Sequence, residues 1–175
     1  MTNNDADCSS DNCTSQGGGI YAAAAALSTS SVGSTTPTVS LTNVTVADNQ
    51  NFCAPSTSAQ ACTATGGGLS TPESAAVFGS TFQQNISQCG NATSRNCAGG
   101  GGIYATGPLS VTNSTLTFNH VTCAGASCTA NGGGVAGADA TITSATLDSN
   151  YVCPETCAVG GAGGNVGSVG SGGSV

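Results

Sequence analysis

The feature that most constrains this chain is a closely spaced cysteine pair followed by a cluster of glycines, which recurs five times. In the first four copies the glycines lead into an apolar residue, as in Gly100-Gly101-Gly102-Ile103. The pairs are Cys8 and Cys13, Cys53 and Cys62, Cys89 and Cys97, Cys123 and Cys128, and Cys153 and Cys157. A unit that recurs every ~20–50 residues is typical of a solenoid. We therefore expect stacked repeats rather than one irregular core.

Four segments align without gaps on an asparagine, and their aligned positions alternate between apolar and polar side chains. Alternation with a period of two is typical of β-strands with one buried face. The first column is Leu41, Val77, Val111 and Ile142, and the sixth is Val46, Phe82, Leu116 and Leu147. Between them runs a threonine column that we expect to face outward: Thr45, Thr81, Thr115 and Thr146. A one-residue corner at Asn43, Gly79, Asn113 and Ser144 would reset the alternation, because these residue types tolerate tight bends.

These columns predict an all-β fold, a parallel β-helix of about four to five coils over residues 17–164. We expect three short strands per coil, the third formed by the glycine motif, with the cysteine segments as loops that leave the coil. The crossover preference of parallel strands favours a right-handed helix. Residues 1–16 are expected to form a polar N-terminal segment, and residues 165–175 a flexible Gly/Ser-rich tail.

Two motifs in these repeats resemble a known family. Phe82-Gln-Gln-Asn85 fits the pattern F-x-x-N, and the glycine clusters followed by Ile, Leu or Val are similar to G-G-A-[ILV]. Together they resemble the repeats of the polymorphic outer-membrane proteins, which are exported bacterial β-helix passenger domains linked to adhesion. Other coils carry Val46, Leu116 or Leu147 in place of the phenylalanine, and a third glycine replaces the alanine. The resemblance implies a right-handed β-helix of an adhesin-like, autotransporter-type passenger.

The aligned asparagines and the cysteines are both predicted to be structural. Asparagines stacked at a turn can hydrogen-bond to each other and to the backbone, so a ladder is expected at Asn49, Asn85, Asn119 and Asn150. Each cysteine pair is expected to form a local disulfide. Zinc is the alternative for the two pairs from Cys123 onward, but it needs four ligands at one point and loop lengths here vary. No metal or other cofactor is expected.

The charge balance excludes several partners. The net charge is −7 with one basic residue, Arg95, whereas nucleic acids and anionic membranes attract Lys and Arg. No apolar run approaches the ~18 residues of a transmembrane helix, so we expect no membrane insertion by this segment. No signal peptide is visible, yet paired cysteines indicate an oxidising compartment. We therefore expect a fragment of a longer protein, extracellular or at the cell surface.

For function, we expect a non-catalytic stalk or adhesin-like module that contacts a host glycan or protein surface. The alternative is a polysaccharide lyase or glycosidase, but one cation and scattered carboxylates do not form such a site. The single histidine, His120, is expected to be an ordinary surface residue. A second alternative is ice binding by the threonine column. Candidate binding surfaces are that column and the cysteine segments, including Arg95, which we place inside a cysteine loop.

Overall fold

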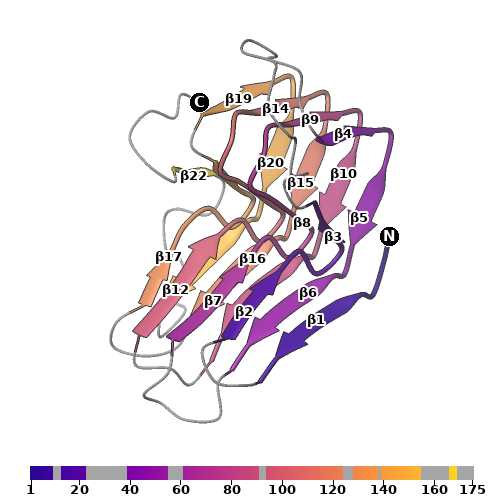
Figure 1. Cartoon of the computed structure of the whole chain (residues 1–175). Helices are drawn as coiled ribbons and strands as arrows, with labels where there is room; N and C mark the ends of the chain where they lie inside the picture. Colours follow the sequence, from indigo (N-terminus) through magenta and orange to yellow (C-terminus); the bar gives the residue numbers. More distant parts are fainter. Residues whose placement is uncertain are drawn as a thin grey trace, which may run out of the picture.

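The described part of the chain consists of β-strands without any helix, and every strand pair is parallel (Figure 1). The structure is a computed structural model that describes residues 1–9, 13–22, 39–54, 61–90, 94–123, 128–137, 139–154 and 166–168. Within the stack, a strand lies beside the fifth strand that follows it along the chain, as β6, β11 and β16 do. Such stacking of successive coils defines a parallel β-helix, as the sequence predicts.

The strands form five sheets, which we name A to E, and each complete coil contributes one strand to each sheet in the order E, A, B, C, D. Sheet E contains β4 (Val39–Thr42), β9 (Ala75–Phe78), β14 (Leu109–Thr112) and β19 (Ala140–Thr143). Sheet A contains β5 (Thr45–Ala47), β10 (Thr81–Gln83), β15 (Thr115–Thr117) and β20 (Thr146–Asp148). Sheet B contains β1 (Asp5–Cys8), β6 (Gln50–Cys53), β11 (Ile86–Cys89), β16 (His120–Cys123) and β21 (Tyr151–Pro154).

The last two sheets follow the cysteine segments. Sheet C contains β2 (Cys13–Gln16), β7 (Ala61–Thr65), β12 (Ser94–Gly99) and β17 (Cys128–Ala130). Sheet D contains β3 (Ile20–Tyr21), β8 (Leu69–Thr71), β13 (Ile103–Ala105), β18 (Val135–Gly137) and β22 (Val166–Ser168). The first four strands of sheet D begin directly after the glycine clusters, where the sequence places the third strand.

The expectation of three strands per coil is wrong, because each coil has five. The residues beside the cysteines do not leave the coil but continue it as sheets B and C. Their inward side chains are small, such as Asn51 and Cys53 in β6 and Cys62 and Ala64 in β7. These residues are not the large aliphatic types that are typical of a core strand. The alternation of inward and outward residues in sheets B and C is therefore easily mistaken for loop sequence.

Two separate clusters of buried side chains divide the cross-section. The first, which we call the aliphatic core, lies between sheets D, E and A and includes Phe82, Leu69, Ile103 and Leu116. The second lies between sheets B and C and consists of Cys53, Cys62, Cys89, Ala64 and Val121, with Cys8 packed against it. We call this two-sheet projection the arm. In Figure 1 the arm is the lower part of the molecule, where β1, β6 and β16 lie beside β2, β7, β12 and β17.

Besides the first glycines of the clusters, which are also left-handed, two columns of left-handed residues turn the chain between sheets. The first is the expected corner between sheets E and A, where φ is 53° at Asn43, 57° at Gly79, 50° at Asn113 and 52° at Ser144. The second lies just before the asparagine ladder, where φ is 56° at Asn3, 55° at Asp48, 53° at Gln84, 56° at Phe118 and 53° at Ser149. The sequence does not reveal this second corner, because Gln and Phe are not typical of left-handed backbone.

A narrow waist joins the aliphatic core to the arm, and it explains the glycine clusters. The central glycine of each cluster packs against the backbone of the first residue of a sheet B strand. A Cβ atom at Gly67 would lie 2.5 Å from backbone atoms of Ile86, and one at Gly101 would lie 2.5 Å from His120. Real Cβ atoms do not approach backbone so closely, so these positions require glycine.

Candidate functional site

The aligned asparagines line the other side of the waist and form a continuous ladder. Each Nδ2 donates to the Oδ1 of the next asparagine, over 2.9 Å from Asn49 to Asn85, 2.8 Å from Asn85 to Asn119 and 2.9 Å from Asn119 to Asn150. The residues of these pairs are separated by 36, 34 and 31 positions, which are the lengths of the three coils. The second proton of Asn85 Nδ2 goes to the carbonyl of Val46 over 2.9 Å. Buried amides with this many partners stabilise the turn.

The ladder has a member that the sequence analysis does not include. Asn4 donates from its Nδ2 to the Oδ1 of Asn49 over 2.8 Å. The two residues are 45 positions apart, a longer interval than in later coils, so Asn4 does not align by spacing. The segment before β1 therefore belongs to the stack and covers the start of sheet A, where the N-terminal amino group donates to the carbonyl of Thr45 over 2.8 Å.

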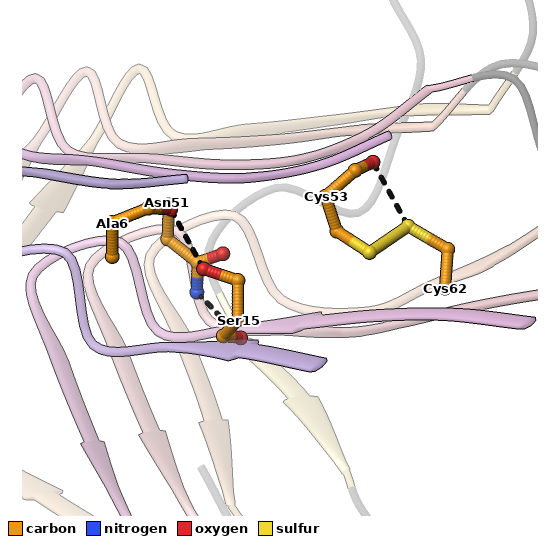
Figure 2. The surroundings of a disulfide bond; sticks show 5 residues. All are labelled: Ala6, Ser15, Asn51, Cys53 and Cys62. Carbon is orange, nitrogen blue, oxygen red and sulfur yellow. Dashed lines mark hydrogen bonds between the residues drawn. A yellow bond between two sulfur atoms is a disulfide. The ribbon is translucent and has the colours of Figure 1, made fainter. Parts of the chain in front are cut away.

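The arm is closed by a disulfide within one coil. Cys53 ends β6 and Cys62 lies in β7, and their sulfur atoms are bonded with the Cα atoms 5.9 Å apart, well within the distance that a disulfide spans (Figure 2). Both side chains are buried at 0% and 1% exposure, so the bond takes the place of a core contact. The Sγ atom of Cys62 also lies 2.8 Å from the carbonyl oxygen of Cys53. This is a contact rather than a hydrogen bond, because a disulfide sulfur carries no proton.

Most of the remaining cysteines continue the same two columns, but Cys153 is in register with Thr122 and so lies one position out of the sheet B column. In sheet B, Cys8, Cys53, Cys89 and Cys123 are in register. Cys8 and Cys89 are also disulfide-bonded. The side chains of the partners expected for them, Cys13 and Cys97, lie outside the described residues, as do those of the Cys123–Cys128 and Cys153–Cys157 pairs. In sheet C the backbone of Cys13 is in register with Cys62, whereas that of Cys97 is in register with Ala64.

Between the disulfide and the waist, the arm is filled by polar and small side chains. Asn51 is fully buried and donates from Nδ2 to the carbonyl oxygens of Ser15 over 3.1 Å and Thr65 over 2.7 Å, which links sheet B to sheet C (Figure 2). Ser15 donates back to the carbonyl oxygen of Ala6 over 2.7 Å. The Oδ1 of Asn51 and the Oγ of Ser87, its neighbour in register, are buried and have no hydrogen-bond partner among the described residues. The polar interior of the arm is therefore less completely paired than the ladder.

The expected outward threonine column is present on sheet A, and a second outward column lies on sheet E. Thr45, Thr81, Thr115 and Thr146 are in register, with Thr45 and Thr146 exposed and the middle two partly buried. On sheet E, Thr42, Phe78, Thr112 and Thr143 form a parallel column. Phe78 is 47% exposed and interrupts the threonines of this column. The two faces together are uncharged except for Asp148 at the edge of sheet A.

Arg95 belongs to a strand, which corrects its expected place in a loop. It lies in β12, and its backbone is in register with Cys62 on one side and Cys128 on the other. The strand forms because β7 and β17 offer it paired backbone on both sides. Its involvement in binding stays a prediction.

A hollow that the sequence analysis does not identify lies on the outside of the corner between sheets A and B. We call it the A–B groove, and its volume is about 370 Å³. Two columns line it: the left-handed residues Asp48, Gln84 and Phe118, and the first residues of the sheet B strands, Gln50, Ile86, His120 and Tyr151. The groove exists because the second left-handed corner bends the coil inward beside the waist. Since both columns vary in residue type, no repeated motif marks them in the sequence.

Aromatic side chains concentrate at one end of this groove. The rings of His120 and Tyr151 are stacked with their centroids 4.6 Å apart and their planes 6° from parallel. Phe118 is 50% exposed and Tyr151 is 39% exposed. Burial lowers the pKa of His120 below 6.5, an effect partly opposed by a hydrogen bond with the backbone of Phe118. Burial therefore favours the neutral imidazole, and the ring is stacked and largely covered, which differs from the ordinary surface residue that the sequence suggests.

Among the described residues, no group of three or more His, Cys, Asp or Glu side chains could hold a metal ion. Within the same residues there is also no helix of the length and apolarity needed to cross a membrane. No family model, curated protein or solved structure matches the chain.

Proposed function

We propose that this chain is a non-catalytic module of an exported protein, displayed at a surface or secreted, that holds recognition segments on a rigid stalk. The observation that carries this proposal is the alignment of strand ends at the tip of the arm. The cysteines of four sheet B strands, Cys8, Cys53, Cys89 and Cys123, form one column, and Cys13, Cys62, Arg95 and Cys128 are aligned in sheet C. The four segments that connect these strands of sheets B and C therefore start and end at one edge.

These connections differ in length and sequence, whereas the coils that carry them repeat. Residues 55–60 and 124–127, for example, share no sequence pattern. Variable segments on a regular scaffold are where recognition usually takes place. The buried disulfide between Cys53 and Cys62 supports an oxidising, extracellular compartment, in which such bonds persist. The resemblance of the repeats to adhesin-like passenger domains favours the same class of function.

The test is binding without turnover. The oxidised protein is applied to a glycan array and to cultured cells, and the same preparation is incubated with pectin and related polysaccharides. We expect saturable binding and no release of sugar products. In separate variants residues 55–60 and 91–93 are replaced by glycine and serine at unchanged length, and we expect at least one to lose tenfold or more in binding. Product release would contradict the proposal, as would full binding of cells by both variants.

Ice binding is the second candidate, favoured by the register of the threonines on sheet A. Strand spacing places identical hydroxyl and methyl groups at regular intervals of ~4.8 Å along the stack. Thermal hysteresis of the purified chain distinguishes this function from adhesion. If the purified chain shows thermal hysteresis and the double variant Thr81→Lys, Thr115→Lys loses it, the threonine column is an ice-binding face. In that case we expect the unchanged protein to bind neither cells nor glycans.

A further inference from the structure

The A–B groove contains a residue that the fold alone does not explain. Phe118 has φ of 56°, in a region that costs a bulky L-residue about 1–2 kcal/mol. The same column in other coils carries Asn3, Asp48, Gln84 and Ser149, which are polar. Phe118 is half exposed, so it gains little packing in return. A strained and exposed aromatic residue at the rim of a hollow points to a ligand, because strain of this kind concentrates at functional sites.

We propose that the A–B groove binds a neutral sugar unit of a glycan, with Phe118 and the stacked His120–Tyr151 pair as the apolar platform. A sugar ring has an apolar face of C–H groups and an edge of hydroxyl groups, so it needs an aromatic surface beside hydrogen-bonding groups. The groove provides both, since Gln50, Gln84 and Asp48 line it next to the rings. Its volume of about 370 Å³ lies within the range of ~300–1,000 Å³ common for small-ligand sites.

The charge of the chain selects among sugars. Asp48 can accept hydrogen bonds from hydroxyl groups but repels a uronate or sialate carboxylate. None of the described groove residues is a lysine or an arginine, and the net charge of the chain is −7. Acidic glycans would therefore be repelled both locally and at a distance. Neutral hexoses and N-acetylhexosamines match the lining best.

This inference goes beyond the proposed function, because it adds a second binding site with its own ligand class. The site lies on the side of the coil, where the A–B corner faces outward, and is separate from the tip of the arm. The two parts of the molecule can therefore be tested separately.

The only histidine of the chain gives a direct reporter, because its imidazole proton signals need no assignment. The oxidised protein is titrated with neutral tetrasaccharides of glucose, mannose and N-acetylglucosamine, and with a tetrasaccharide of galacturonate. We expect a saturable shift of the His120 signals with at least one neutral sugar and none with the uronate. No shift with any neutral sugar at millimolar concentration overturns the inference, and so does an equal response to the uronate.

A pair of phenylalanine variants separates binding from folding. Phe118→Asn removes the ring and places a residue that tolerates φ of 56°, so we expect a higher midpoint of thermal unfolding and at least tenfold weaker sugar binding. Phe78→Asn removes a ring of similar exposure from sheet E, and we expect unchanged affinity. Equal affinity of the Phe118→Asn variant and the unchanged protein contradicts the platform role.

Free polysaccharides and protein-linked glycans present the same sugar faces, so a mannose-bearing glycoprotein and its deglycosylated form are compared in the same titration. Stronger binding of the glycosylated form supports a protein-linked source, and binding of only the free tetrasaccharides supports a polysaccharide. Equal binding of the deglycosylated protein overturns the sugar assignment in favour of a peptide. If cells are bound through the tip while the His120 signals stay unchanged, this inference fails and the proposed function stands. If a sugar shifts His120 and is cleaved, the ligand class stands and the proposed non-catalytic function fails.

Discussion

The aliphatic core and the arm are built by the same coils but are held together in different ways. In the core, large apolar side chains such as Phe82 and Ile103 fill the space between sheets D, E and A. In the arm, sheets B and C enclose cysteine, alanine, serine and asparagine side chains. Small side chains bury little apolar area, so the hydrophobic contribution per coil is lower in the arm. The difference teaches that a disulfide and a few amide hydrogen bonds can replace an apolar core where two sheets lie close together.

The largest expected effect is in the aliphatic core. Phe82→Ala removes a fully buried ring, and we expect the free energy of unfolding to fall by about 3–5 kcal/mol in urea denaturation. Phe78→Ala in the same coil is the matched control, since that ring is 47% exposed, and it should cost under ~1 kcal/mol. Similar losses for the two variants would show that the core is not what holds this coil.

Substitutions at the waist should lower the free energy of unfolding nearly as much as those in the aliphatic core. Asn85→Ala removes the acceptor for the Nδ2 of Asn49 and the donor to Val46, and we expect a loss of about 3 kcal/mol. Asn51→Ala in the arm is the comparison. It is equally buried, but its Oδ1 is already unpaired, and Ala6 occupies the same register position in the preceding strand. We expect about 1 kcal/mol for Asn51→Ala. A larger loss than for Asn85→Ala would reverse the ranking of the two regions.

The arm itself should open when its disulfide is removed. Replacing Cys53 and Cys62 together by alanine should lower the free energy of unfolding by about 2–3 kcal/mol, mainly because the unfolded chain gains freedom. Hydrogen exchange locates the effect: amides of β6 and β7 should exchange faster, whereas those of β5 and β10 should keep their protection. Equal acceleration in all four strands would show that the arm and the core unfold as one unit.

The smallest expected effect is the pH dependence from His120. Its pKa is lowered in the folded protein, so the unfolded chain binds the proton more tightly. This contribution to stability is complete above pH 6.5 and is lost as the pH falls through the folded pKa. Tyr151 stacks on the ring, and Asp48 is the carboxylate that lines the same groove. NMR titration of His120 should give a midpoint below 6.5, and His120→Gln should flatten the stability profile between that midpoint and pH 6.5. A midpoint above 6.5 would contradict the burial of the ring.

The sequence predicts those parts of the fold that depend on repeated large side chains and on glycine or asparagine at corners. The Phe82 column and the bend at Asn43 are of this kind, because strand alternation and left-handed backbone leave local marks. The arm could not be predicted in the same way, since Asn51 and Ala64 face inward without being typical core residues.

The A–B groove and the first residue of the asparagine ladder, Asn4, are even harder to predict from the sequence than the arm. Phe118 and Gln84 occupy the same left-handed corner, yet neither residue type indicates one. His120 and Ile86 are neighbours in register although they share no chemistry. Asn4 joins the ladder across an interval of 45 residues that no later coil repeats. Such features come from the stacking of coils, which is a tertiary property, and not from local pattern.

The disulfide between Cys53 and Cys62 lies within one coil and does not itself join neighbouring coils, and this has a mechanical consequence. If the two ends of the stack are pulled apart, this coil can separate from its neighbours without breaking that bond. The coil from Asn49 to Asn85 has 36 residues and would extend by about 120 Å as a free chain, but the disulfide withholds a segment of nine residue steps. The extension is then nearer to about 90 Å. Each such disulfide reduces the length of free chain that one unfolded coil adds. A stack of these coils therefore lengthens less under a pulling force.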